Sequence, residues 1–480
     1  MTTRVEKDSM GEMEVPVAAL YGASTQRAVL NFPISGREVP DEIIRAYAAL
    51  KSACAEANRR LGRLDDGRAE AIAEACAEIE AGLVDRGGLR VHFPVDVYQT
   101  GSGTSTNMNA NEVIANLVCL AKGGAVGASK DPAFIEKGGV HPNDHVNMGQ
   151  SSNDTFPTAL HVAGAVAIAE DLLPAVERME AELLLKQAAW DEVVKIGRTH
   201  LQDATPIRLG QEFGGYASQM THAKDRLRRS LHVLGELAIG GTAVGTGINT
   251  HERFGAEVAS ILSERTGLLF REASDHCEAQ HAKDGVVEVS GVCKTIAVSI
   301  SKIANDIRWM GSGPRCGIGE LVLPAVQPGS SIMPGKVNPV ICESAMMVAC
   351  RVIGNDAAVT TAGLGGVGSV LDLNVAMPVM ADALLESIRL LASTCRTMTD
   401  TLLRGLEPDR ERCAALIEGS LAMCTSLAPV IGYDRAAALA KEAFETGKTV
   451  RELAREQRVL DEAELERLLN PETMTRPDPA

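Results

Sequence analysis

Apolar residues recur three and four positions apart over long stretches of this chain, and this spacing predicts helices. Between residues 41 and 61 the apolar positions include Ile43, Tyr47, Leu50 and Cys54, which share one face of a helix. Longer patterns of the same kind predict helices at 157–194, 209–237, 281–310, 340–361 and 375–403. Long apolar helices are typical of a bundle. We therefore predict an all-α fold with a central bundle of long helices.

Shorter elements are expected on both sides of this bundle. Residues 1–20 favour a short strand or hairpin, 67–83 and 112–117 favour helices, and 93–99 favours a short strand. Pro174 predicts a kink or break in the helix at 157–194, and Asp154 and Thr155 are candidates for its N-cap. The more charged end of the chain predicts small helices, the last at 462–467, and a frayed tail at 471–480. We expect three domains: a mostly helical one at 1–148, the bundle at 149–406 and a small helical one at 407–480.

Composition narrows the functions that are open to such a fold. Aromatic residues make up only 3% of the chain, so the core must consist of small aliphatic side chains. The net charge of -16 disfavours nucleic acid as a partner. The 11 cysteines include no C-x-x-C pair, which favours reduced thiols in a cytoplasmic protein. The N-terminus lacks the apolar run of a signal peptide, and no uncharged run is long enough to span a membrane.

Four polar stretches interrupt the helical pattern, at 100–107, 141–153, 197–203 and 329–338. The first two lead into helices, whose N-termini offer free N–H groups and a favourable dipole to an anion. Side chains there that suit an anion are Ser102, Thr104, Ser151, Ser152 and Asn153. Each of them is also a common helix cap, but four such stretches make capping alone a weaker explanation.

The stretch at 329–339 combines hydroxyl, cationic and amide side chains with glycines. Pro334 and Pro339 exclude a regular helix. In an extended segment Lys336 and Asn338 point the same way, which suits a loop that grips a small anion. The composition of this stretch fits a tight surface loop equally well.

His200 is a candidate general base or a structural histidine. It stands among polar residues before a predicted helix led by Pro206, and Glu343 is a candidate to orient it or to hold its proton.

Three other motifs are weaker than they first look. The spacing from Gly329 to Gly335 is one residue too long for a phosphate-binding P-loop, and Val337 stands at its Ser/Thr position. The glycines at 363–368 match a dinucleotide fingerprint but lack a preceding strand. The two histidines at 141 and 145 suit a metal only on a helix, and Pro142 favours a loop. We expect no metal and no cofactor.

The ordered set of polar segments resembles the fumarase/aspartase superfamily, and most of all its class II fumarases. The similar segments are TGSGT (100–104), HPND (141–144), SSND (151–154), GRTHLQDA (197–204), GGTAVGTG (240–247), SGPRCG (312–317) and GSSIMPGKVNP (329–339). The resemblance implies an all-helical homotetramer in which each active site draws on three subunits. It also implies a small dicarboxylate substrate.

The resemblance assigns roles for the reversible anti-elimination of water from L-malate to give fumarate. Ser330 is the implied base, acting as an alkoxide. Lys336, Asn338 and loop N–H groups would stabilise the aci-carboxylate that forms, and His200 with Glu343 would handle the hydroxyl or water. The implied substrate contacts are Ser102, Gly103, Thr104, Ser151, Ser152, Asn153, Thr199, Ser331, Lys336, Val337 and Asn338.

A secondary dicarboxylate site is implied at His141, Pro142, Asn143 and Asp144. The chain departs from the family pattern just before it, because Gly138 stands where some fumarases place a basic residue.

Two kinds of alternative stay open. Aspartate ammonia-lyases carry Gln at the position of His200 and Asn at that of His141, so both positions favour a fumarase, while Gly103–Ser105 and His145 are more aspartase-like. Besides a fumarase and an aspartate ammonia-lyase, another succinyl-type lyase of the same superfamily is a third possibility. A catalytically silent helical scaffold is a different class, which the complete set of Ser330, Lys336 and His200 disfavours.

Overall fold

The computed structural model describes residues 2–477, and their contacts form two compact units. The first unit contains Met1–Pro174, Asp225–Thr295 and Cys350–Ala392, and the second contains Ala175–Lys224, Ile296–Ala349 and Ser393–Ala480. Both units are mainly helical, as the apolar periodicity predicts, and the strands pair only into small two-stranded sheets. The division into domains at 148 and 406 stays a prediction.

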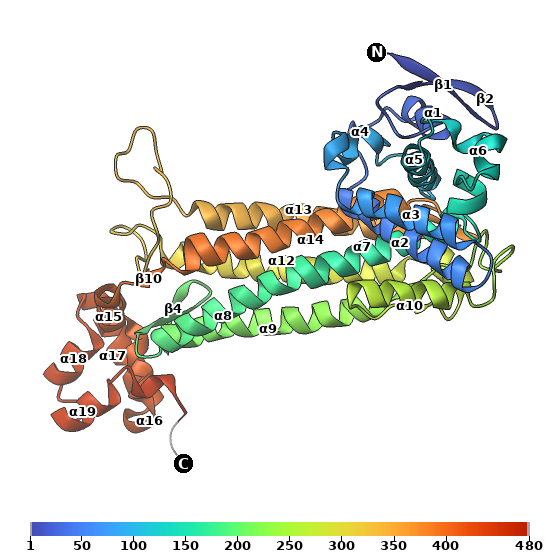
Figure 1. Cartoon of the computed structure of the whole chain (residues 1–480). Coiled ribbons are helices and arrows are strands. Elements are labelled where there is room, and N and C mark those ends of the chain that lie inside the picture. Colours follow the sequence, from blue (N-terminus) through green and yellow to red (C-terminus); the bar gives the residue numbers. More distant parts are fainter. Residues whose placement is uncertain (1, 478–480) are drawn as a thin grey trace. The chain divides into compact units, whose positions relative to one another are not determined.

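The long helices fall close to their predicted positions. They are α8 (Leu173–Ala189), α9 (Leu209–Leu234), α12 (Asp284–Met310), α13 (Val340–Gly363) and α14 (Met377–Thr397). Figure 1 shows α12, α13 and α14 running side by side. In the first unit, buried hydrogen bonds join them: Ser290 to Asp356 (2.9 Å) and Asn355 to Ser387 (3.1 Å).

The first unit also contains a set of shorter helices. They are α1 (Ala23–Asn31), α2 (Asp41–Arg60), α3 (Asp66–Glu80), α4 (Leu89–His92), α5 (Thr104–Ala121), α6 (Pro132–Glu136), α7 (Ser152–Ala167), α10 (Phe254–Thr266) and α11 (His276–His281). The predicted apolar face of α2 is buried, with Tyr47 and Leu50 fully enclosed, and α2 packs against α3, α7 and α10 (Figure 1). The first unit also contains two very short sheets, β5–β6 (236–237 with 271–272) and β8–β9 (369–370 with 373–374).

The strand predicted at 93–99 is wrong. Asp96 forms only an isolated bridge with Glu38. Its carboxylate accepts hydrogen bonds from the backbone N–H groups of Ser35, Gly36 and Tyr98 at 2.7–2.8 Å. A carboxylate that accepts hydrogen bonds from several nearby backbone N–H groups stabilises a turn rather than a strand.

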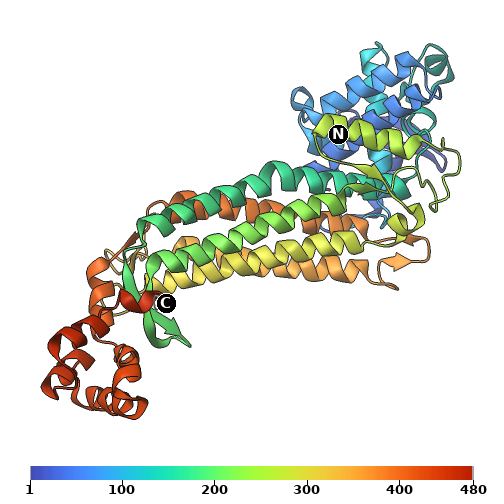
Figure 2. The ribbon, with the colours of Figure 1, turned by 90° about the horizontal axis from the view of Figure 1, so that it is seen from below.

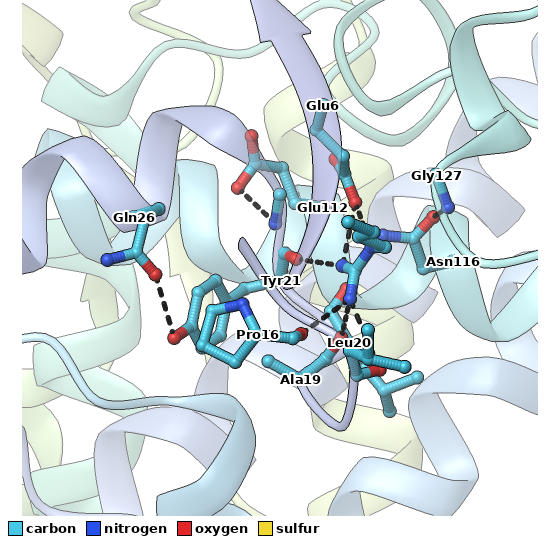
Figure 3. A network of polar contacts seen from close by, with 12 residues as sticks. Glu6, Pro16, Ala19, Leu20, Tyr21, Gln26, Glu112, Asn116 and Gly127 are labelled. Carbon is cyan, nitrogen blue, oxygen red and sulfur yellow. Dashed lines mark hydrogen bonds and ion pairs between the residues drawn. The ribbon is translucent and has the colours of Figure 1, made fainter. Parts of the chain in front are cut away.

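The predicted N-terminal hairpin is confirmed as β1 (Thr3–Asp8) paired antiparallel with β2 (Gly11–Pro16). Polar contacts fix the segment that follows it against α5 (Figure 3). Glu112 is 2% exposed and accepts from the N–H groups of Gly22, Ser24 and Thr25, while Asn116 donates to Leu20 O (2.7 Å). These bonds hold α5, which carries one of the polar stretches at its N-terminus.

The helical run from 152 to 189 changes its geometry in the middle. A π-helical segment, Ile168–Leu172, separates α7 from α8. Pro174 has no N–H to donate to the carbonyl of Glu170, so the regular ladder is interrupted where the sequence predicts a kink. The predicted caps need correction, because Ser151 is the N-cap and Asp154 occupies the third helical position of a capping box.

A hairpin in the second unit was not predicted from the sequence. Strands β3 (Val194–Thr199) and β4 (Gln202–Arg208) pair antiparallel, with a bulge between Ile196 and Arg198. Pro206 therefore lies in a strand and does not lead a helix, since α9 begins at Leu209. Proline is tolerated there because this two-stranded sheet leaves strand edges free.

The C-terminal part of the second unit is a cluster of small helices (Figure 2). They are α15 (Arg410–Glu418), α16 (Ala428–Ile431), α17 (Tyr433–Thr446), α18 (Val450–Glu456) and α19 (Glu462–Leu468), around buried residues such as Leu427, Leu439 and Leu453. A short β7–β10 pair (321–322 with 407–408) precedes them. The predicted frayed tail is not fully frayed, because Thr475 O accepts from Gln211 and residues 473–475 form a helical turn. Residues 478–480 of that prediction lie outside the described part.

One helical run, Ser152–Ala189, passes a length and hydropathy test for a membrane span. However, 56% of its most apolar window is buried inside the protein. A core helix meets the same criteria.

Candidate functional site

Two of the predicted polar stretches meet through their hydroxyl groups at the starts of α5 and α7. Thr104 Oγ1 lies 2.7 Å from Ser152 Oγ and 2.9 Å from Ser102 Oγ. Thr104 and Ser152 are the first residues of their helices. Two helix N-termini thus face one hydroxyl cluster, which suits a carboxylate because free N–H groups and hydroxyls converge there.

Gly103 is the N-cap of α5 and lies in the left-handed region, with φ +75°. A Cβ at this position would stand 1.9 Å from Cδ2 of Phe156, whose ring is fully buried. Only glycine allows the loop to turn so close to that ring. The contact fixes the 100–104 loop against α7.

The start of α7 is tied to the loop at 240–243. Asp154 is fully buried and accepts from the N–H groups of Ser151 (2.9 Å), Gly240 (3.2 Å) and Thr242 (2.9 Å). Burial raises the pKa of Asp154 to about 7, and the three N–H donors act in the opposite direction. Asn153 adds a bond from its side-chain amide to Ala243 O (2.8 Å). Sequence reasoning treated Asp154 as a cap and missed this bridging role.

The segment predicted as a secondary site forms one turn of π-helix, Pro142–Val146. His141 caps it, since its Nδ1 accepts from the N–H groups of Asn143 (3.2 Å) and Asp144 (3.1 Å). Burial lowers the pKa of His141, which agrees with an unprotonated Nδ1. The 3.2 Å approach of Asp144 to the same nitrogen is therefore not a charged pair. Nearby, His145 Nδ1 accepts from the N–H of His141 (2.8 Å).

The stretch at 329–339 folds as a loop in the second unit. Gly329 N–H donates to Lys336 O (2.9 Å), and the Asn338 side-chain amide donates to Gly329 O (2.6 Å). Inside this ring, Ser330 Oγ accepts from the N–H groups of Ile332 (3.2 Å) and Met333 (3.1 Å). Two converging donors stabilise negative charge on the Ser330 oxygen. Lys336 and Val337 are exposed.

His200 lies at the tip of the β3–β4 hairpin, beside the Thr199–Gln202 pair. His200 and Leu201 have φ +57° and +60°, as in a type I′ turn. Such turns normally carry Asn or Gly, so two bulky residues here are strained.

The base of this hairpin is anchored by charge. Glu320 is fully buried and pairs with Arg198 (2.9 Å) and Lys195 (3.3 Å). The strands are thereby held firmly while the tip stays in solvent. Glu343, the predicted partner of His200, lies exposed in the first turn of α13. Within residues 2–477 the two side chains share no hydrogen bond or ion pair.

Apart from the His141–Asp144 turn and Glu343 on α13, the structure gives the candidate residues in three groups. The first group is the hydroxyl cluster of Ser102, Thr104, Ser152 and Asn153 in the first unit. The second is the Ser330 loop, and the third is the His200 hairpin tip, both in the second unit.

One residue beside the first group escaped the sequence reasoning. Lys51 is fully buried and donates to Asn107, Asn147 and Gln150, which lie in the segments that carry the hydroxyl cluster. A signal for it exists in the sequence, because Lys51 follows Tyr47 by four residues on the apolar face of α2.

Two known family profiles match separate parts of the chain. The profile of the family described as Lyase matches residues 11–354, and that described as Fumarase C C-terminus matches residues 423–476.

Individual relatives agree with these family matches. A class II fumarate hydratase of Corynebacterium efficiens is 51% identical over 481 residues, which covers 99% of this chain and 97% of that protein. One from Mycobacterium tuberculosis is 51% identical over 450 residues, or 94% of this chain and 90% of that protein. The crystal structure of a class II fumarase from Schistosoma mansoni superposes with a TM-score of 0.93 at 38% identity, covering 100% of both chains. The chain therefore belongs to this lyase family and, within it, to the class II fumarate hydratases.

Proposed function

We propose that this protein interconverts L-malate and fumarate by reversible anti-elimination of water. The observation that carries the proposal is the Ser330 loop, in which two backbone N–H groups point at one hydroxyl oxygen. A serine is a weak base unless its alkoxide is stabilised, and two N–H donors in a fixed loop supply that stabilisation. Family membership and the complete set of candidate residues support the same reaction.

The difficult step is the loss of a proton from C3 of malate, beside a carboxylate. In our proposal the Ser330 alkoxide takes this proton, and the electron pair moves into the carboxylate to form an aci-carboxylate. Catalysis then depends on stabilising the added charge. Lys336 suits that task, because no carboxylate in the described part of the chain pairs with its ammonium group. Asn338 keeps the loop closed through its bond to Gly329 O, and exposed Val337 and Ser331 flank the site.

His200 is proposed to protonate the leaving hydroxyl, with Glu343 as its orienting partner. Both side chains are exposed in the single chain, and the strain at the hairpin tip supports a role beyond structure. The substrate carboxylates are proposed to bind Ser102, Gly103, Thr104, Ser151, Ser152, Asn153 and Thr199. The His141–Asp144 turn is proposed as the secondary dicarboxylate site.

The active site is proposed to form in a homotetramer, in the cytoplasm. In the second unit, Val298, Trp309 and Met347 on the long helices are 55%, 44% and 67% exposed. Large apolar side chains on one set of helices are typical of surfaces that associate. Light scattering after size-exclusion chromatography should give four times the chain mass, and Met347→Glu should lower it. A monomer with full activity would contradict this arrangement.

The reaction is tested by following the absorbance of the fumarate double bond. With L-malate the absorbance should rise, and with L-aspartate it should stay flat. The reverse pattern would instead identify an aspartate ammonia-lyase. Activity with neither substrate would favour the silent scaffold.

A further inference from the structure

A buried lysine binds both segments that carry the hydroxyl cluster, and within residues 2–477 its hydrogen bonds all go to side-chain amide oxygens. Lys51 Nζ donates to Asn107 Oδ1 (2.8 Å), Asn147 Oδ1 (2.9 Å) and Gln150 Oε1 (2.9 Å). These three bonds use all the donors of an ammonium group. Within residues 2–477 no carboxylate forms an ion pair with it. Burial lowers the pKa of Lys51 to about 8, so it stays charged at neutral pH.

The three acceptors belong to the two segments that carry the hydroxyl cluster, helix α5 and the loop before α7. Asn107 lies three residues after Thr104, one turn along α5. Asn147 and Gln150 form the loop that leads to Ser151, the N-cap of α7. Lys51, which belongs to α2, therefore fastens the start of α5 to the approach of α7.

The amide groups are themselves linked to one another. Asn147 Oδ1 also accepts from the side-chain amides of Asn107 (3.1 Å) and Asn111 (3.3 Å), and Asn107 Oδ1 accepts from Thr155 Oγ1 (3.2 Å). A buried charge without an ion-pair partner is costly, and here amide dipoles and the Tyr47 ring, whose centroid lies 6.0 Å from Lys51 Nζ, stabilise it. Nearby Asp154 is buried as well, and an ionised Asp154 would repel a carboxylate ligand. A lysine at this place offsets that charge.

We propose that Lys51 is a positioning residue for the substrate carboxylate: it clamps the start of α5 at Thr104 to the loop before Ser151 and places a positive charge between these two segments. This inference rests on the proposed function, because it deepens the role of the hydroxyl cluster. A neutral side chain at this position would leave the helix N-termini without that charge. Binding of a dianion would then weaken in the ground state and in the transition state alike, so KM would rise more than kcat falls.

The test compares two variants with the wild type. Lys51→Met removes the charge and the clamp. Asn147→Asp keeps the lysine but neutralises it with a carboxylate of the same shape. The readouts are kcat and KM with malate, and the Kd of succinate by calorimetry. We expect KM and Kd to rise about tenfold in both variants, with kcat changed less.

A matched control separates this role from a loss of stability. Lys186, in the second unit, is 7% exposed, and within the described residues it likewise donates only to carbonyl oxygens, those of Arg404 and Leu406. Lys186→Met should lower the unfolding temperature and leave KM and the succinate Kd unchanged. If Lys51→Met fails to fold, the Kd of succinate for Asn147→Asp alone tests the role of Lys51.

Three results would overturn the inference: an unchanged Kd in folded Asn147→Asp, an equal rise of Kd in Lys186→Met, or a wild type that binds no dicarboxylate. A wild type that binds succinate but does not turn over malate refutes the proposed reaction alone. In that case the succinate Kd values of the variants still test the role of Lys51 in binding.

Discussion

Replacing Gly103 by alanine tests how the hydroxyl cluster is positioned. The new Cβ would stand 1.9 Å from the Phe156 ring, about 1.5 Å short of ordinary contact at 3.4 Å. Phe156 is fully buried and packs edge to face on Tyr47, with ring centroids 6.1 Å apart, so it has no free space to move into. The left-handed φ costs about 1–2 kcal/mol in alanine and the overpacking about 1–3 kcal/mol, a loss of about 2–5 kcal/mol in the free energy of unfolding.

Gly123 offers a matched control at the other end of the same helix. Its φ is +73°, and a Cβ there meets nothing within 4 Å. Gly123→Ala should therefore lower the free energy of unfolding only by the cost of the left-handed φ, about 1–2 kcal/mol, as measured by urea unfolding followed by circular dichroism. Because the clash displaces Thr104 by more than an ångström, Gly103→Ala should also lose about 10²-fold in kcat/KM, while Gly123→Ala keeps it. Equal unfolding midpoints for the two variants, with full activity in Gly103→Ala, would refute this reasoning.

Four further substitutions probe the other parts of the account. Ser330→Ala should lower kcat by about 10³-fold or more without changing the unfolding midpoint, because the loop is exposed; near-normal turnover would show that Ser330 is not the base. Asparagine tolerates positive φ, so His200→Asn and Leu201→Asn should both stabilise the hairpin tip. His200→Asn should lose activity, whereas Leu201→Asn should stay active. Equal activity in the two variants would show that His200 has no catalytic role. Burial lowers the pKa of His161 to about 4, below its unfolded value, so unfolding free energy should fall as pH drops from about 6.5 towards 4, by at most about 3 kcal/mol. His161→Asn keeps a donor for Glu236 O and should flatten that pH dependence in urea titrations; an unchanged slope would assign it to other groups.

Elements with a long hydrophobic period were predictable from the sequence. The helix at 41–60 and the helices α9, α12, α13 and α14 each show an apolar face over many turns. The interruption before Pro174 was predictable too, because a missing N–H acts locally. The β3–β4 hairpin was not, since its turn is His200–Leu201 and carries none of the Asn or Gly residues that signal such turns.

The candidate site was only partly open to sequence reasoning. Hydroxyls before helices point to anion binding, and Thr104 and Ser152 do meet. The contacts of buried charges were hidden, because they join residues far apart in the chain. Lys51 forms a hydrogen bond with Gln150, and Asp154 forms one with Thr242. No local sequence pattern predicts either pair.

Proton NMR of the purified protein with fumarate in deuterium oxide, with and without ammonium, tests the central claim most directly. The account predicts malate that carries one deuterium at C3 in a single relative configuration, because the Ser330 hydroxyl exchanges with solvent and delivers a deuteron to one face while deuterium oxide adds to the other. It also predicts no aspartate when ammonium is present. Aspartate as the product, or malate with deuterium in both C3 configurations, would contradict the proposed reaction.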